Sequence, residues 1–341
     1  MKERTGKNYE AWGVKVENFP IDSPVEKQLS FLINYAVLAP STHNSQPWVF
    51  QIRNNKIRIK KNSKRALKIA DGQENLMYIS LGCALENLLI ASDYFGFKHE
   101  INYFLSDLND VTVCEVVFNK KSGISNYNKH FIFSIPQRHT NRGKYDNKIP
   151  KQGFLEEIKN FFNEDVGIEI ISDVETKEKI TEIMLLARED TFSDKEFRNE
   201  LAGHQRNNLT KSFTGMPGFT MGFPSILSFL TPTVVRKINV MKIIKNKDRE
   251  LLNKHTPLFL IIKLKEVNKK NCLLAGRFFE RIALMAESRG LHTAFQEIPL
   301  HIDKLQEILG TKHFPKIFFR MGYALKKMGH SPRIPAKKTI I

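Results

Sequence analysis

The sequence predicts a protein of mixed helices and strands, of the α+β class, in which two similar halves are joined. Two long apolar helices are expected, over residues 76–95 and 273–288, and each is followed by a glycine stop. Three positions recur 194 residues later: Gly82, Glu86 and Gly96 return as Gly276, Glu280 and Gly290. Three matches alone do not establish a duplication. A helix–strand region precedes each long helix and a buried-type strand follows it, and this shared order favours one.

The spacing of the apolar residues predicts the other helices and strands of the first half. An irregular lead-in over 1–24 precedes them. In order, the pattern predicts a helix at 28–38, two strands at 48–52 and 56–60 around the turn sequence Arg-Asn-Asn, and a strand buried on both faces at 111–118. A polar connection over 119–136 ends at a proline, so we expect the first half to span 25–136 and the second 137–341.

The second half has a longer series of elements. The pattern predicts helices at 152–162, 174–187, 195–211 and 302–309, and strands at 167–171, 258–264 and 317–323. The stretch 214–224 is rich in Gly, Pro and Met, and an apolar run follows it. These residues are expected to pack in the core or, alternatively, to form a lid around 212–247. Glu86 and Glu280, on the two long helices, are expected to cap or to pair with an arginine across the core, since buried glutamates are rarely unpaired.

Composition favours a globular protein of the reducing cytoplasm. The 341 residues are 41% hydrophobic and 26% charged. No leader peptide and no 18-residue apolar run are recognised, so no membrane partner is expected. The three cysteines are scattered, which predicts neither disulfides nor a metal site. The net charge of +17 suits anionic partners, but no nucleic-acid-binding signature accompanies it, so no nucleic acid is expected either.

One wall of a ligand pocket is predicted at residues 39–48, Ala-Pro-Ser-Thr-His-Asn-Ser-Gln-Pro-Trp. This stretch packs hydroxyl and amide donors and two prolines between apolar segments. A second stretch, Gln-Arg-His-Thr-Asn-Arg at 137–142, carries arginines four apart with a hydroxyl between them. Such a pair can converge on one phosphate, because guanidinium groups match its geometry. A capping and salt-bridge cluster is the alternative for this second stretch.

Several other chemistries lack their motifs. The chain has no glycine-rich dinucleotide fingerprint, no Gly-x-Ser-x-Gly elbow and no histidine spacing typical of a metal site. We therefore expect no metal.

Taken together, these stretches resemble the flavin-dependent nitroreductase superfamily. Residues 39–50 are similar to its A-P-S-x-x-N-x-Q-P-W-x-F signature, and 137–145 resemble its arginine motif. The arginine motif follows the A-P-S motif here, an order similar to the long, Acg-type branch, in which two halves are fused into a pseudo-dimer. The resemblance implies a nitroreductase-like fold whose halves each have a mostly antiparallel sheet flanked by helices. The chain would be a monomeric pseudo-dimer or a homodimer.

The resemblance also implies one FMN between the halves, with hydride passing from NAD(P)H to flavin N5 and on to a small-molecule acceptor such as a nitroaromatic or quinone. Because the flavin would carry the chemistry, no catalytic side chain is expected. By this resemblance Arg138, Thr140 and Arg142 hold the phosphate, assisted by Arg333. The remaining cofactor-binding residues would be Pro40, Ser41, Thr42, Asn44, Gln46, Gln296 and Glu297, the last two near N5. The alternative is a flavin-sequestering protein with a lid-covered site and little reductase activity.

Overall fold

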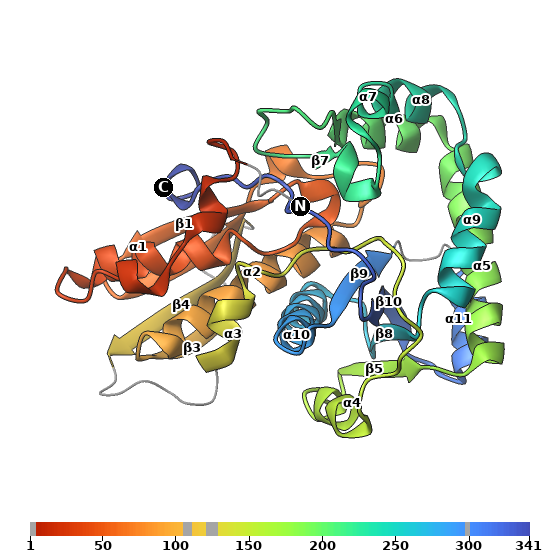
Figure 1. The fold of residues 1–341 in the computed structure, drawn as a ribbon. Helices are drawn as coiled ribbons and strands as arrows, with labels where there is room; N and C mark the ends of the chain where they lie inside the picture. The colour runs from red at the N-terminus through yellow and green to blue at the C-terminus, as the bar shows by residue number, and fades with distance from the viewer. Residues whose placement is uncertain (1–4, 105–110, 121–128, 297–300) are drawn as a thin grey trace.

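The computed structural model describes residues 5–104, 111–120, 129–296 and 301–341. Two four-stranded antiparallel sheets, each accompanied by a long helix, dominate the described residues (Figure 1). The prediction of the α+β class is therefore confirmed.

The first sheet has the strand order β1-β2-β4-β3, and all neighbours are antiparallel. Its strands are β1 (Trp48–Arg53), β2 (Lys56–Lys61), β3 (Phe97–Tyr103) and β4 (Thr112–Lys120). The predicted hairpin is confirmed, with Asn54 in the left-handed region (φ 53°) at its turn. The helices of this part are α1 (Val25–Ala36), α2 (Asn75–Tyr94) and α3 (Lys129–Ser134). Neither β3 nor α3 was predicted, because β3 is largely polar and α3 is only six residues long.

The second sheet repeats the first. Its order is β5-β8-β10-β9, again antiparallel throughout, with strands β5 (Val166–Ile171), β8 (Leu258–Leu264), β9 (His292–Gln296) and β10 (Phe314–Gly322). In both sheets the long helix joins the second strand to the third, and the fourth strand pairs between them. The boundary between halves at 136/137 stays a prediction.

The two long helices, α2 and α10 (Lys269–Glu287), cross at the centre of the molecule (Figure 1). A Cβ on Gly82 would lie 2.0 Å from the carbonyl oxygen of Leu273, and a Cβ on Gly276 would lie 2.0 Å from that of Ile79. The two contacts are reciprocal, because Ile79 and Leu273 are themselves 194 positions apart. Reciprocity of this kind marks a two-fold interface, so the glycines are the reason the helices meet backbone to backbone.

A long insertion separates β5 from β8, whereas a two-residue turn joins β1 to β2. It holds α5 (Val174–Ser193), α6 (Lys195–His204), β6 (Gln205–Arg206), β7 (Met216–Pro217), α7 (Ser225–Ser228), α8 (Thr231–Lys237) and α9 (Met241–Lys254). Helices α5 and α9 pack together beside the second sheet, and α6, α7 and α8 lie together near β7 (Figure 1). The predicted helix over 195–211 is wrong beyond His204, since Gln205 is extended and pairs with Met216.

The remaining helices are short. They are α4 (Gln152–Lys159) and α11 (Ile302–Leu309), with 3-10 turns η1 (Glu10–Gly13), η2 (Val16–Asn18), η3 (Thr42–Asn44), η4 (Ser63–Arg65), η5 (Gly218–Met221) and η6 (Ala336–Lys338). Among the helices described, α2 is long and apolar enough to cross a membrane, but 89% of its most apolar window is buried in the fold. It is the core helix of the first half.

The C-terminus lies beside the first sheet (Figure 1). The C-terminal segment forms a bridge to β1, in which Phe50 N–H donates to Thr339 O at 2.8 Å and Ile341 N–H donates to Phe50 O at 2.9 Å. Nearby, the indole of Trp12 donates to Ser331 O at 2.8 Å. The last strand belongs to the second sheet, so the tail crosses from one half to the other and carries residues 329–333 over the loop at 39–48.

Candidate functional site

A cleft of about 470 Å³, open to solvent, brings the two sequence motifs together. Its lining is Trp12, Pro40, Ser41, His43, Asn44, Arg138, His139, Thr140, Arg142, Met216, Gly329, Ser331 and Arg333. Three arginines and no acidic side chain are among these residues. The cleft is therefore electropositive and suits an anionic ligand.

The loop before β1 has an unusual backbone. His43, Asn44 and Gln46 all have positive φ angles, of 50°, 55° and 54°. Left-handed backbone is uncommon outside glycine and persists only where the surroundings hold it in place. Here the hydroxyl of Ser41 accepts from the N–H of Gln46 at 2.9 Å and closes the turn.

The amide side chains of this loop link it to two distant segments. Asn44 Nδ2 donates to Gly215 O and to Pro332 O, both at 3.0 Å. Gln46 Nε2 donates to Phe213 O at 2.7 Å, and its Oε1 accepts from Ile334 N–H at 2.8 Å. These bonds fix the insertion and the tail against the loop.

Arg333 enters the cleft from the tail and is almost fully buried. It donates to Asn44 Oδ1 at 2.7 Å and to Leu38 O at 3.3 Å, and its guanidinium lies 4.8 Å from the ring centroid of Trp12. Within the described part of the chain its Nε has no hydrogen-bond partner. Burial, with the charge of Arg138 adding to it, lowers the pKa of Arg333 to about 9. A buried, incompletely satisfied cation of this kind is stabilised by an anion.

Arg138 is also buried, and its Nε lies 3.3 Å from a carboxylate oxygen of Glu280 on α10. Burial raises the pKa of Glu280 to about 7, although the nearby charge of Arg138 opposes the shift. Near neutral pH this carboxyl group is therefore only partly ionised, and the positive charges of Arg138 and Arg333 are not fully balanced.

Glu86 occupies the equivalent position on α2. Its oxygens pair with Arg281 Nε at 2.6 Å and with Arg277 Nε at 3.0 Å. Burial would raise the pKa of Glu86, but these two guanidinium groups outweigh burial and hold that pKa below its ordinary value. The prediction that both glutamates pair with arginines is confirmed.

The segment that carries Thr140 and Arg142 is docked against the second sheet. Thr140 forms a bridge with Thr293 of β9, and Asn141 N–H donates to Thr293 O at 2.9 Å. Asn141 Nδ2 also donates to Lys326 O at 2.8 Å. Arg142 lies at the edge of the cleft, 3.5 Å from Thr220 O of η5. Thr140 and Arg142 are thus positioned by the second sheet, and they line the same cleft as the loop at 39–48.

Seven of the residues predicted to bind the cofactor line this one cleft: Pro40, Ser41, Asn44, Arg138, Thr140, Arg142 and Arg333. Thr42 and Gln46 belong to the same loop but are not part of the lining, and the fully buried Gln46 amide is engaged in the links described above. Gln296 lies at the end of β9, where its amide oxygen accepts from Arg188, and it is also outside the lining. Glu297 lies outside the described residues.

Sequence reasoning missed several lining residues. His43 and His139 sit inside the two motifs, but neither was singled out. Burial lowers the pKa of His43 to about 3, so its ring is neutral at pH 7. Trp12 comes from the lead-in, where a lone tryptophan was the available signal, and Met216 comes from the stretch expected to form a core or a lid.

No protein-family model and no curated protein matches the chain. Solved structures with a related arrangement include iodotyrosine deiodinase bound to FMN and 3-iodo-L-tyrosine, at 13% identity and a TM-score of 0.38, covering 60% of this chain and 95% of that one. The FMN and NADPH-dependent nitroreductase NfnB from sphigopyxis sp. strain HMH has 11% identity, a TM-score of 0.42 and coverages of 62% and 97%. NfnB from Mycobacterium smegmatis, solved with NADPH, has 12% identity, a TM-score of 0.41 and coverages of 60% and 94%.

Two of these neighbours are FMN-dependent nitroreductases and the third is a deiodinase bound to FMN, and each is smaller than this chain. At such scores the likeness carries no argument about the activity of this chain. The conclusions below therefore rest on the residues of the cleft.

Proposed function

We propose that the cleft binds FMN and that the chain is an FMN-dependent oxidoreductase of nitroreductase type, using NAD(P)H as the electron donor. The observation that carries the proposal is the meeting of two motifs distant in sequence, 39–48 and 137–142, in one acid-free cleft with three arginines.

The residues present fit the two ends of a flavin mononucleotide. Arg142, with the hydroxyl of Thr140, would hold the phosphate, and the buried charge of Arg333 would add to the positive potential around it. Arg138 is paired with Glu280, so we assign it mainly to this positive potential and not to direct contact with the phosphate. Pro40 and Ser41 would face the ring, because a flat ring needs apolar contact and a few placed donors.

When bound, the flavin would supply hydride acceptance from NAD(P)H and hydride donation to a small acceptor such as a nitroaromatic or a quinone. The chain itself would bind, orient and shield the ring. His43 is neutral and adds no charge beside the ring, and the cationic cleft stabilises negative charge that develops on a bound group.

The direct test is Arg142→Ala. A charge-assisted hydrogen bond contributes about 1.5–3 kcal/mol, so loss of this side chain should weaken FMN binding about 10- to 100-fold, measured by quenching of flavin fluorescence. Arg53→Ala, on the exposed turn of the first hairpin, is the control and should bind FMN as wild type does. Equal affinities of the two variants for FMN would contradict the assignment of Arg142 to the phosphate.

A second candidate function is flavin binding behind a cover, with little reductase activity. It is favoured by the bonds from Asn44 and Gln46 to residues 213–215 and by Met216 on the cleft lining. Met216→Ala should widen the entrance on that side. If the flavin of the wild type reacts slowly with NADH and that of Met216→Ala reacts at least about tenfold faster, the covered-site function holds. Equal, fast rates in both proteins support the reductase instead.

A further inference from the structure

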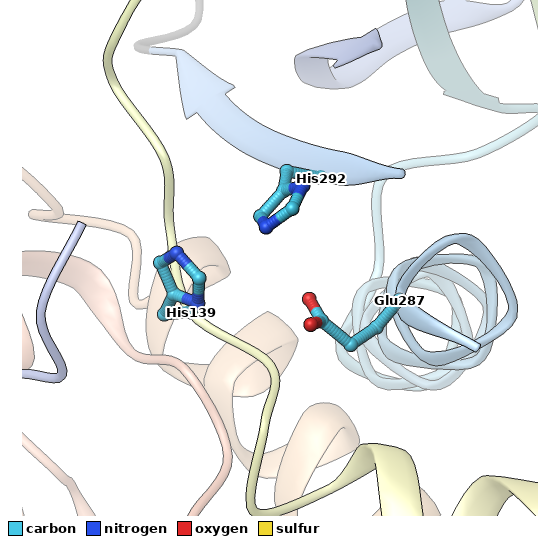
Figure 2. Close-up of side chains that lie close together, drawn as sticks. All are labelled: His139, Glu287 and His292. Carbon is cyan, nitrogen blue, oxygen red and sulfur yellow. The ribbon is translucent and has the colours of Figure 1, made fainter. Parts of the chain in front are cut away.

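Beside the cleft, three side chains from separate segments point toward one another (Figure 2). His139 lies in the segment 137–142, called the arginine segment below. Glu287 is the last residue of α10, and His292 is the first residue of β9. One ligand atom from each of the three lies within 4.8 Å of the others. Both imidazoles are more than nine-tenths buried, with exposed fractions of 6%.

The hydrogen bonds of His139 leave one ring nitrogen for a ligand. Its Nδ1 lies 3.0 Å from Gln137 O, so Nδ1 carries the proton and donates to that carbonyl. Its Nε2 is buried and has no hydrogen-bond partner among the described residues. Metal-binding histidines commonly show this arrangement, in which a carbonyl fixes the tautomer and the opposite nitrogen presents its lone pair.

His292 is in a similar state. Neither of its ring nitrogens reaches a partner with normal hydrogen-bond geometry within the described residues, although the carbonyl of Gly290 is close enough to influence its pKa. A buried polar group without a partner is destabilising by about 1–3 kcal/mol. Packing alone does not explain why two buried imidazoles with unpartnered ring nitrogens face one carboxyl group.

We propose that His139, Glu287 and His292 form a binding site for a first-row divalent cation, with Zn²⁺ as the best match. Two imidazoles and one carboxylate are a donor set that Zn²⁺ uses in proteins, leaving a further coordination position for water or another small ligand. With metal–ligand bonds of about 2.0–2.2 Å, ligand atoms in a tetrahedral site are ~3.4 Å apart. Since the ligand atoms lie within 4.8 Å of one another, a contraction of at most about 1.4 Å would bring the three groups to that spacing.

The protonation states of the two histidines favour a bound cation, whereas the nearby positive charges oppose it. Burial lowers the pKa of His139 to about 4 and also lowers the pKa of His292, so both rings are neutral near pH 7, as metal ligands must be. Burial raises the pKa of Glu287 to about 7, so this carboxyl group must lose a proton on binding, and the charges of Arg138 and Lys327, which oppose that shift, also repel a cation. Arg138 is held by Glu280, whereas Lys327 is exposed and can move away.

A bound cation would join the arginine segment to the end of α10 and the start of β9. The end of α10 and the start of β9 are neighbours in the sequence, whereas His139 comes from a segment well before them that also lines the cleft. The cation would therefore brace the wall that carries Thr140 and Arg142. It would also raise the thermal stability of the protein with increasing metal concentration, because it binds only the folded chain.

The test uses the full chain without a histidine tag, freed of metal and flavin, and titrated with Zn²⁺ against a chromophoric chelator. We expect one tight site per chain. Glu287→Gln and His292→Ala should weaken it at least about 100-fold, since even indirect partners of a metal contribute 10- to 100-fold. The matched controls, Glu250→Gln and His301→Ala, lie outside the cluster and should bind as wild type does.

Lys327→Gln should tighten binding about threefold or more, because it removes a repelling charge. No tight site in the wild type, or unchanged affinity in both Glu287→Gln and His292→Ala, would overturn the proposal. If those variants do not fold, X-ray absorption at the zinc edge on the wild type decides. Two imidazoles with a carboxylate support the site, and a sulfur-containing or all-oxygen shell overturns it. Every readout is independent of flavin, so it stands whether or not the cleft binds FMN.

Discussion

At the scale of single residues, the buried carboxyl group of Glu280 is the ion-pair partner of Arg138 in the cleft lining. It is fully buried between α10 and two arginines, and burial raises its pKa to about 7. The folded protein therefore holds this proton more tightly than the unfolded chain does. The resulting stabilisation is complete below the ordinary pKa of about 4.5 and is lost as the pH rises through 7.

Glu280→Gln removes this titration while keeping the shape of the side chain. The free energy of unfolding of the wild type minus that of Glu280→Gln should fall by on the order of 2 kcal/mol between pH 4.5 and 7.5. Urea denaturation of the flavin-free proteins measures the difference, in which other titrating groups cancel. A flat difference, or one that grows with pH, would mean that Glu280 is ionised throughout.

How far single residues were predictable depends on where their partners lie. Pro40, Ser41 and Arg142 were found because each sits in a dense local pattern of donors or charges. Asn44 was found too, but its links to Gly215 and Pro332 were not, since they join positions 171 and 288 residues apart. For Trp12 a lone tryptophan in an irregular segment was too weak a signal, because this residue reaches the cleft through the contact of the lead-in with the C-terminal tail.

At the scale of elements, the crossing of α2 and α10 is the feature that tolerates least change. Gly82→Ala and Gly276→Ala each place a methyl group 2.0 Å from a backbone oxygen of the facing helix. Backbone cannot move aside as a side chain can, so the helices must separate. Each change should lower the free energy of unfolding by about 2–4 kcal/mol, measured by denaturant unfolding.

Gly153→Ala in α4 is the matched control, because nothing lies within 4 Å of its added methyl group. Alanine favours helix over glycine, so this variant should be unchanged or more stable by up to about 1 kcal/mol. If Gly82→Ala were as stable as Gly153→Ala, the two long helices could not cross as closely as described.

Strong hydrophobic runs made most elements predictable, including both long helices and the buried strands β4 and β8. Prediction failed where tertiary pairing decides. The end of α6 at His204 is set by the pairing of Gln205 with Met216, which overrides the helical tendency of the following residues. The strand β3 reads as polar alternation, and its edge position in the sheet explains why few of its side chains needed to be apolar.

At the scale of the whole molecule, two sheets of the same topology meet through a reciprocal helix crossing, but their surroundings differ. The loop at 39–48 accompanies the first sheet and the arginine segment the second, and each motif occurs once. The glutamates show the same asymmetry: Glu86 is paired with two arginines of α10, whereas Glu280 is paired with Arg138 of the cleft lining. The internal repeat of the two long helices indicated the two-fold arrangement from the sequence. The long insertion between β5 and β8 made these strands hard to match with β1 and β2, which only a two-residue turn separates.

This asymmetry makes one flavin per chain the expected stoichiometry. The measurement that tests this most directly is the visible absorbance spectrum of the purified protein, loaded with FMN and separated from free flavin, before and after NADH or NADPH is added under nitrogen. The account predicts one bound flavin per chain, with its absorbance bleached by at least one of the two nucleotides. A protein that retains no flavin would contradict the proposed cleft, and a bound flavin that neither nucleotide bleaches would contradict the proposed reductase.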